Sequence, residues 1–153
     1  MVTVTTRVEI DAPIQLVFDL ARDIDVHTRT VWPHTKEKAV RGVTSGRIGH
    51  GQTVTFEAKH LGVRQRLTSL ITEYREPYLF VDEMQKGAFK TLKHTHEFEE
   101  INGKTVMTDT LCFEAPFGII GRWVERIILK EYMRKFLEHR NNQLKKVAEA
   151  GDA

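Results

Sequence analysis

The sequence has little cysteine: Cys112 is the single one among 153 residues. One thiol cannot form an internal disulfide, and this usage fits a reducing compartment. No stretch approaches the roughly 20 apolar residues that a membrane span needs. The beginning, MVTVTTRVEIDAP, lacks the basic segment and continuous apolar run of a signal peptide. These absences lead us to expect a soluble, cytoplasmic protein without stable membrane insertion.

An excess of charge of one sign is also missing. Lysine and arginine number 23 against 21 acidic residues, a formal charge of +2, so nothing points to nucleic acid as a partner. The chain carries no P-loop, G-x-S-x-G or dinucleotide-binding motif in a fitting context. Its glycine-rich stretch, Gly46 to Gly51, lies between expected strands rather than before a helix. We therefore expect no cofactor, and a single domain over residues 1–153.

What is present is a clear order of elements. Residues 2–10 alternate apolar and polar side chains, which predicts a half-buried strand. Apolar residues at helical spacing predict a short helix over 13–23, and a second is expected over 24–30. Between 37 and 114, five or six strand-like runs are separated by turn residues. A long helix follows over roughly 118–148. The pattern predicts an α+β fold, in which a curved antiparallel sheet of six to seven strands wraps around the C-terminal helix.

Asn102-Gly103 fixes the register of one hairpin, because a type I′ turn needs positive φ at both central residues. Ile101 then pairs with Lys104, and His96 lies opposite Asp109. Opposed residues share a face of the sheet. That face is mostly apolar and must point inward; it carries Leu92, His94, His96, Phe98, Met107, Asp109, Leu111 and Phe113.

Two histidines and a carboxylate on an inner face need partners, since an unpaired buried polar group costs several kcal/mol. They could be a satisfied polar pair in the core, the polar part of a ligand cavity, or a catalytic pair with His96 as base and Asp109 orienting it. A metal site is a weaker alternative: His-x-His places both rings on one face, with Asp109 as third ligand, but the signal is short. We expect no metal. Cys112 falls on the opposite face, which disfavours a Cys-His nucleophile.

Several stretches resemble the helix-grip superfamily called SRPBCC, which includes START domains and polyketide cyclase/dehydrases. They are VTFEAKHLGVRQRLTSLITEY (54–74, after Gly51), GAFKTLKHTHEFEE (87–100), TDTLCFEAPFG (108–118) and RKFLEHRNNQL near the end. The chain looks most like bacterial ligand-binding SRPBCC proteins, some labelled as cell-division inhibitors. The resemblance implies a cavity between sheet and helix for a small, largely apolar molecule. His94, His96, Asp109 and His27 match positions of that subgroup.

The last helix has apolar residues on two faces. One stripe contains Leu129, Met133, Phe136, Leu137, Leu144 and Val147, and we expect it to lie on the sheet. The other contains Ile120, Trp123, Val124 and Ile127. Loops on both sides of the first turns, or a short helix before a bend, would explain it most simply. It could also form a lid with Phe117, a surface for a second subunit, or a weaker membrane contact through the flanking Arg122, Arg126 and Lys130.

Our preferred hypothesis is a module that binds one small hydrophobic or amphipathic molecule, lipid- or polyketide-like. The residues expected to contact it are His94, His96, Asp109, Phe56, Leu67, Phe80, Leu92, Phe98, Met107, Leu111, Phe113, Phe117, Trp123 and His27. The alternatives are a cyclase/dehydrase- or hydrolase-type enzyme using His96 and Asp109, and a protein-interaction module, with a homodimer as one form.

Overall fold

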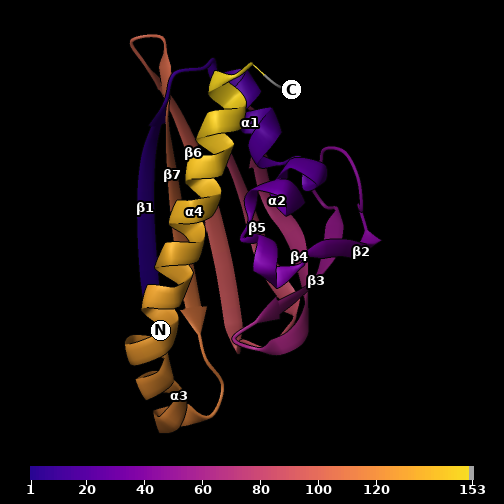
Figure 1. Cartoon of the computed structure of the whole chain (residues 1–153), viewed down its shortest axis with the longest axis vertical. Coiled ribbons are helices and arrows are strands. Elements are labelled where there is room, and N and C mark those ends of the chain that lie inside the picture. Colours follow the sequence, from indigo (N-terminus) through magenta and orange to yellow (C-terminus); the bar gives the residue numbers. More distant parts are fainter. Residues whose placement is uncertain (152–153) are drawn as a thin grey trace.

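A computed structural model describes residues 1–151 and has the expected α+β architecture (Figure 1). The strands are β1 (Val2–Ile10), β2 (Lys38–Gly42), β3 (Thr53–His60), β4 (Val63–Arg75), β5 (Leu79–Lys86), β6 (Thr91–Ile101) and β7 (Lys104–Glu114). Between β1 and β2 lie α1 (Ile14–Ala21), α2 (Ile24–Thr30) and the 3-10 turn η1 (Pro33–Thr35). The chain ends in α3 (Gly118–Val124), the π-helical turn η2 (Glu125–Leu129) and α4 (Lys130–Glu149).

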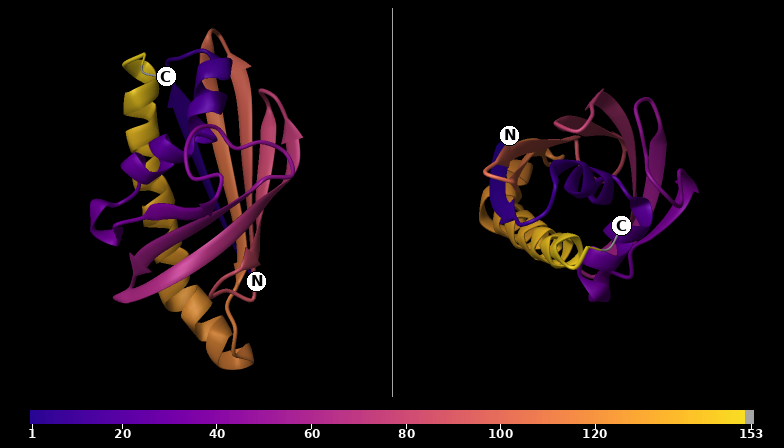
Figure 2. Two further views of the ribbon diagram at one scale, coloured as in Figure 1. Left: turned by 90° about the vertical axis from the view of Figure 1, so that its right-hand side faces the viewer. Right: turned by 90° about the horizontal axis from the view of Figure 1, so that it is seen from above.

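All seven strands form one antiparallel sheet in the order β1-β7-β6-β5-β4-β3-β2. This is a meander to which β1 adds at the β7 edge, and each turn predicted from Gly, Pro or Asn falls between two strands. The sheet curves around α4, with α1 and α2 at its open side, as the end-on view in Figure 2 shows. The predicted helix-grip fold is confirmed.

Helix α4 does not cover the sheet evenly. It packs along β1 and touches α1 and α2, whereas β3, β4 and β5 curve away from it. Its buried positions include Leu137 and Leu144, both from the stripe expected to face the sheet. This one-sided packing leaves space between the helix and the middle strands. No helix within residues 1–151 is long and apolar enough to cross a membrane.

The β6–β7 hairpin has the predicted register. Ile101 pairs with Lys104, and the pairing continues through His96 with Asp109 to Leu92 with Phe113. Asn102 and Gly103 both have positive φ, 53° and 79°, as a type I′ turn requires. The inward residues Phe98, Met107, Asp109, Leu111 and Phe113 are buried.

The turn provides a test of what sets this register. Gly103→Ala should cost about 1–2 kcal/mol of the free energy of unfolding, because an L side chain is strained at φ 79° even with open space around its Cβ. Gly49→Ala is the matched control. Its φ is not positive, and its Cβ would meet only Gln52 Oε1, at an ordinary 3.5 Å. Urea unfolding of both variants measures the difference, and equal costs would contradict a turn-determined register.

Candidate functional site

Asp109 on β7 is the centre of a buried polar cluster. Its side chain is fully buried, and its Oδ1 accepts a hydrogen bond from His94 Nε2 at 2.8 Å. The amide of Asn141 on α4 donates to Oδ2, also at 2.8 Å. His96 Nδ1 lies 3.2 Å from Oδ1, and Arg140 Nη1 lies 3.7 Å from it. The carboxylate of Asp109 is thus contacted by imidazole groups from β6 and by amide and guanidinium groups from α4.

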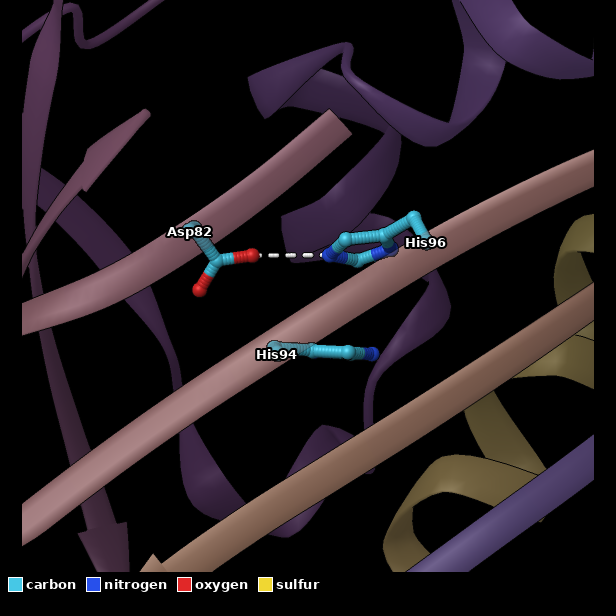
Figure 3. Close-up of side chains that lie close together, drawn as sticks. All are labelled: Asp82, His94 and His96. Atoms are coloured by element: carbon cyan, nitrogen blue, oxygen red, sulfur yellow. Dashed lines mark hydrogen bonds and ion pairs between the residues drawn. The ribbon is translucent and has the colours of Figure 1, made fainter. Parts of the chain in front are cut away.

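A second carboxylate, Asp82 on β5, approaches the histidines from the other side. His96 Nε2 lies 2.7 Å from Asp82 Oδ2, the shortest contact in the cluster (Figure 3). In the sheet register Asp82 lies opposite His94, and Asp109 lies opposite His96. Each aspartate therefore makes its shorter contact with the diagonal histidine. Diagonal neighbours across antiparallel strands are within reach of long side chains.

The rings themselves are stacked. His94 and His96 have centroids 3.7 Å apart, and Phe80 lies on the other face of His96 at 4.0 Å. Figure 3 shows the two imidazoles nearly parallel, with Asp82 pointing at the edge of His96. A stack bounded by an aromatic ring allows little rotation. The nitrogen atoms of His96 are thereby held toward the two carboxylates.

The electrostatics separate the two histidines. Burial, and then the charge of His96, lower the pKa of His94 despite its bond to Asp109. Burial also disfavours charge on His96, but its contacts with Asp109 and Asp82 outweigh this and raise its pKa above the usual value. Burial would raise the pKa of Asp109, yet the bonds from both histidines hold it well below its usual range. Burial would also raise the pKa of Asp82, but the bond from His96 and the charge of that ring lower it. The cluster therefore favours a charged His96 between ionised aspartates, beside a neutral His94.

The helix supplies the remaining partners. Arg140 is buried, and its Nη2 donates to the carbonyl of Ala21 at 3.1 Å. Its Nη1 donates to Asn141 Oδ1 at 3.1 Å. Within residues 1–151, the Nε of Arg140 has no hydrogen-bonding partner. The positive charge of Arg140 balances the second of the two aspartate charges, and its Nε–H stays unpaired among these residues.

Asp82, His94 and His96 also resemble a metal-ligand set. One potential ligand atom of each lies within 4.8 Å of the others. Imidazole and carboxylate are donors that zinc and iron accept. Asp109, our sequence-based third ligand, is not part of this set. An ion here would compete with the proton shared by Asp82 and His96 at 2.7 Å.

A cavity of about 310 Å³ opens beside the cluster, between α4 and strands β3 to β6. Asp82, His94, His96 and Arg140 line it. Most of the remaining wall is apolar, with Phe56, Leu67, Phe80, Leu92, Leu111, Met133 and Leu137 among its residues. A second polar pair faces the same space: His27 Nε2 lies 2.6 Å from Glu37 Oε1, and the His27 ring stacks on Phe56 at 4.6 Å.

The predicted contact residues divide into two sets. Those that line the cavity are His27, Phe56, Leu67, Phe80, Leu92, His94, His96 and Leu111. The others are not among the lining residues, and direct contact between them and a ligand stays a prediction. Asp109, Phe98, Met107 and Phe113 are buried outside the set of lining residues. Phe117 and Trp123 lie exposed on the α3 segment and do not line the cavity.

Sequence reasoning missed three residues of the cluster. Asp82 is two positions from Phe80 on one strand, so it shares the face already assigned to Phe80. Arg140 and Asn141 lie three and four residues after Leu137, on the buried stripe of the helix. Helical and strand periodicity could have placed all three inward. The available signal was charge on an otherwise apolar stripe.

Asp109→Asn tests the central carboxylate. At neutral pH we expect a loss of about 3–5 kcal/mol of unfolding free energy, because charged His96 and Arg140 would remain buried without it. The folded-state pKa of Asp109 is lowered, so its stabilisation is present above about pH 4 and is lost as the pH falls through the folded value. The gap between wild type and variant should therefore narrow in acid. Urea unfolding at several pH values measures it, with Glu9→Gln as an exposed control that should change little; a gap independent of pH would contradict the assignment.

Comparisons with known proteins agree with this geometry. A protein from Thermus thermophilus, TTHA0849, superposes with a TM-score of 0.77 at 19% identity, covering 99% of this chain and 100% of that one. A START superfamily protein from Mycobacterium smegmatis gives 0.74 at 16% identity, covering 97% of each chain. At these identities the likeness shows the fold alone. A comparison with curated proteins finds no match.

The sequence itself matches one family over residues 1–149, nearly its whole length. That family is described as polyketide cyclase / dehydrase and lipid transport. Its extent agrees with a fold in which strands β3 to β7 and the last helix line one cavity. The chain therefore belongs to the polyketide cyclase / dehydrase and lipid transport family.

Proposed function

We propose that this protein binds one small amphipathic molecule in the cavity between α4 and the sheet, with the polar end of the molecule at the Asp82–His96 contact. The observation that carries the proposal is the combination of an apolar wall with charged groups gathered on one part of it. Ligand sites typically have this composition: apolar lining for affinity and few polar groups for orientation. The family description, which joins cyclases with lipid transport, supports a hydrophobic ligand class.

Size restricts the ligand. The cavity of about 310 Å³ is at the lower end of the roughly 300–1,000 Å³ found for small-molecule sites. It suits a ring system or a short chain better than a lipid with two long acyl chains. Apolar burial would supply most of the affinity, at about 25 cal/mol per Å².

The polar groups restrict its chemistry. Asp82 is an ionised acceptor, so it favours a hydroxyl or another donor on the ligand. A molecule with a hydroxyl near one end and an apolar body satisfies this preference and suits the apolar wall.

Acid–base catalysis is the second candidate. The observation in its favour is His96, which lies against Asp82, faces the cavity and has a raised pKa. In enolisation, protonated His96 would give its proton to a carbonyl oxygen while the Asp82 carboxylate removes a proton from the neighbouring carbon. In loss of water, His96 would protonate the departing hydroxyl and the carboxylate would again accept the proton from carbon. In this mechanism Asp82 is the closer carboxylate partner of His96, a role that the sequence predicts for Asp109. Asp109 instead orients His94.

Filling the cavity should abolish binding without unfolding the protein. Leu67→Trp puts an indole into the cavity, and affinity for the fluorescent apolar probe anilinonaphthalene sulfonate should fall at least about tenfold. Val63→Trp, on the exposed part of the same strand, adds the same group outside and should leave affinity unchanged. Thermal denaturation checks that both variants fold. Equal probe affinity in Leu67→Trp and wild type would place binding elsewhere.

Native mass spectrometry of freshly purified protein distinguishes the two functions. A binding module should carry the same co-purified compound in wild type and in His96→Gln, with a change in occupancy only. An enzyme should carry substrate in the variant, because the proton donor is gone, and product in wild type. A mass difference between the two bound compounds, such as one water, would refute simple binding, and identical compounds would refute catalysis through His96.

A further inference from the structure

The α3–η2 segment presents an unusually apolar surface. Seven large apolar side chains are exposed there: Phe117, Ile119, Ile120, Trp123, Val124, Ile127 and Ile128. The exposed fraction is 82% for Phe117 and 66% for Trp123. We call these seven side chains the α3 patch. Figure 1 shows that α3 projects beyond the sheet at one end of the molecule. Of the two simplest expectations, cover by loops is therefore wrong, whereas a short helix before a bend agrees with α3 followed by the π-helical turn η2.

Local backbone features hold the patch outward. Phe117 has φ 75°, and Gly118 follows with φ 57°, which turns the chain sharply into α3. Gly121 packs so closely that a Cβ there would lie 2.0 Å from the carbonyl oxygen of Pro116. The π-helical turn η2 then adds a residue to one turn of helix, so the apolar stripe before it and the stripe of α4 point in different directions. The patch is a fixed feature of the fold.

The exposed charges within residues 117–130 have one sign, and the exposed Glu131 that follows lies 3.8 Å from Arg134. Between residues 117 and 130 the exposed charged side chains are Arg122, Arg126 and Lys130. The one acidic residue of this stretch, Glu125, is buried, accepts a hydrogen bond from the backbone N–H of Ala115 at 2.7 Å and lies 3.4 Å from the N-terminal amine. Because the whole chain has a formal charge of only +2, this is a local concentration of positive charge.

We infer that the α3 patch docks on a bilayer that contains anionic lipid. Apolar side chains flanked by Arg and Lys are the composition of helices that lie at the interface, with their apolar side among the acyl chains. The basic groups then face lipid phosphates. Contact with a second copy through the same patch is disfavoured, since a two-fold interface would bring the same three cations of each subunit together. The protein would lie on the membrane without crossing it.

Docking would also place the cavity at the membrane. Pro116, Leu129, Tyr132 and Met133, directly before and after the α3 patch, line the cavity. One end of the cavity therefore lies at the base of α3, where an apolar ligand could pass from lipid into protein. This second step rests on the proposed function, whereas docking rests on the patch alone.

Vesicle co-sedimentation tests docking directly. We expect wild type to bind vesicles of phosphatidylcholine with phosphatidylglycerol, and to bind pure phosphatidylcholine at least about tenfold more weakly, because three cations lose their counter-charge. Added salt should weaken binding. Ile120→Ser with Trp123→Ser, and separately Arg122→Glu with Arg126→Glu, should each reduce binding at least about tenfold. All four positions are exposed, so the variants should fold normally.

Matched controls separate the patch from general surface effects. Leu61→Ser with Val63→Ser removes two equally exposed apolar groups at the β3–β4 turn, and Lys59→Glu with Lys93→Glu reverses two charges elsewhere. Neither control pair should change binding. Trp123 fluorescence should shift to shorter wavelength on vesicles, with Trp123→Phe giving the baseline from Trp32.

Three results would overturn the inference: no vesicle binding, equal binding with and without anionic lipid, or dimers that depend on Trp123. Ultracentrifugation of wild type and Trp123→Ser detects the last. Leu67→Trp distinguishes docking from ligand binding, because it should still bind vesicles while losing the apolar probe. Its loss of vesicle binding would contradict the independence of the patch from the cavity.

Discussion

The fold depends on a negative charge placed where water cannot reach it. Asp109 is fully buried on β7, and it is stabilised only because β6 and α4 both bring N–H groups to its two oxygens. The strand partner comes from a hairpin whose register is set by Asn102-Gly103. The helix partner, Asn141, comes from the far end of the chain and also donates to Thr6 on β1. A shift of either element would leave the carboxylate unpaired, so this one group specifies how the helix lies on the sheet.

The need to pair the buried carboxylate of Asp109 also accounts for the cavity beside the polar cluster. Asn141 holds α4 against β7 and β1 through its bonds to Asp109 and Thr6, and Arg140 joins α4 to α1 through the carbonyl of Ala21. The strands on the other side follow the curvature of the sheet away from the helix. A hydrogen bond at the end of β3, between His60 Nδ1 and the hydroxyl of Tyr132 at 2.8 Å, joins them to α4 at the far rim of the gap. Apolar side chains of β3 to β6 then face the helix across a gap that they do not fill. A polar cluster that fixes one side of the interface therefore preserves a cavity on the other.

Much of this was predictable, for identifiable reasons. Strict alternation in residues 2–10, turn residues at each strand end and one Asn-Gly pair determine the strands and the inner face of β6 and β7. The pairing within the cluster was not predictable. Register places His96 opposite Asp109, but stacking of His94, His96 and Phe80 directs the shortest contacts along the diagonals. Asp82 lies on β5, whose register with β6 is not fixed by a two-residue turn, and Arg140 lies on a helix whose placement on the sheet periodicity does not contain.

The exposed stripe of the last helix was visible in the sequence, yet its exposure was not. Periodicity shows that Ile120, Trp123 and Ile127 point away from the stripe of α4, but it does not show what covers them. The deciding residue is Glu125, which faces inward between them and accepts from the backbone of Ala115.

The Glu125 contact is the reverse of the contact at Asp109. The carboxylate of Asp109 lies on a strand and accepts from the helix, whereas the carboxylate of Glu125 lies on the helix and accepts from the end of the strand. The two buried acids fix the C-terminal helix to β7 at separate points. Because the patch is tied to the sheet by one of them, it cannot turn inward to hide its apolar side chains, and its exposure to water is the consequence of a contact that the fold requires.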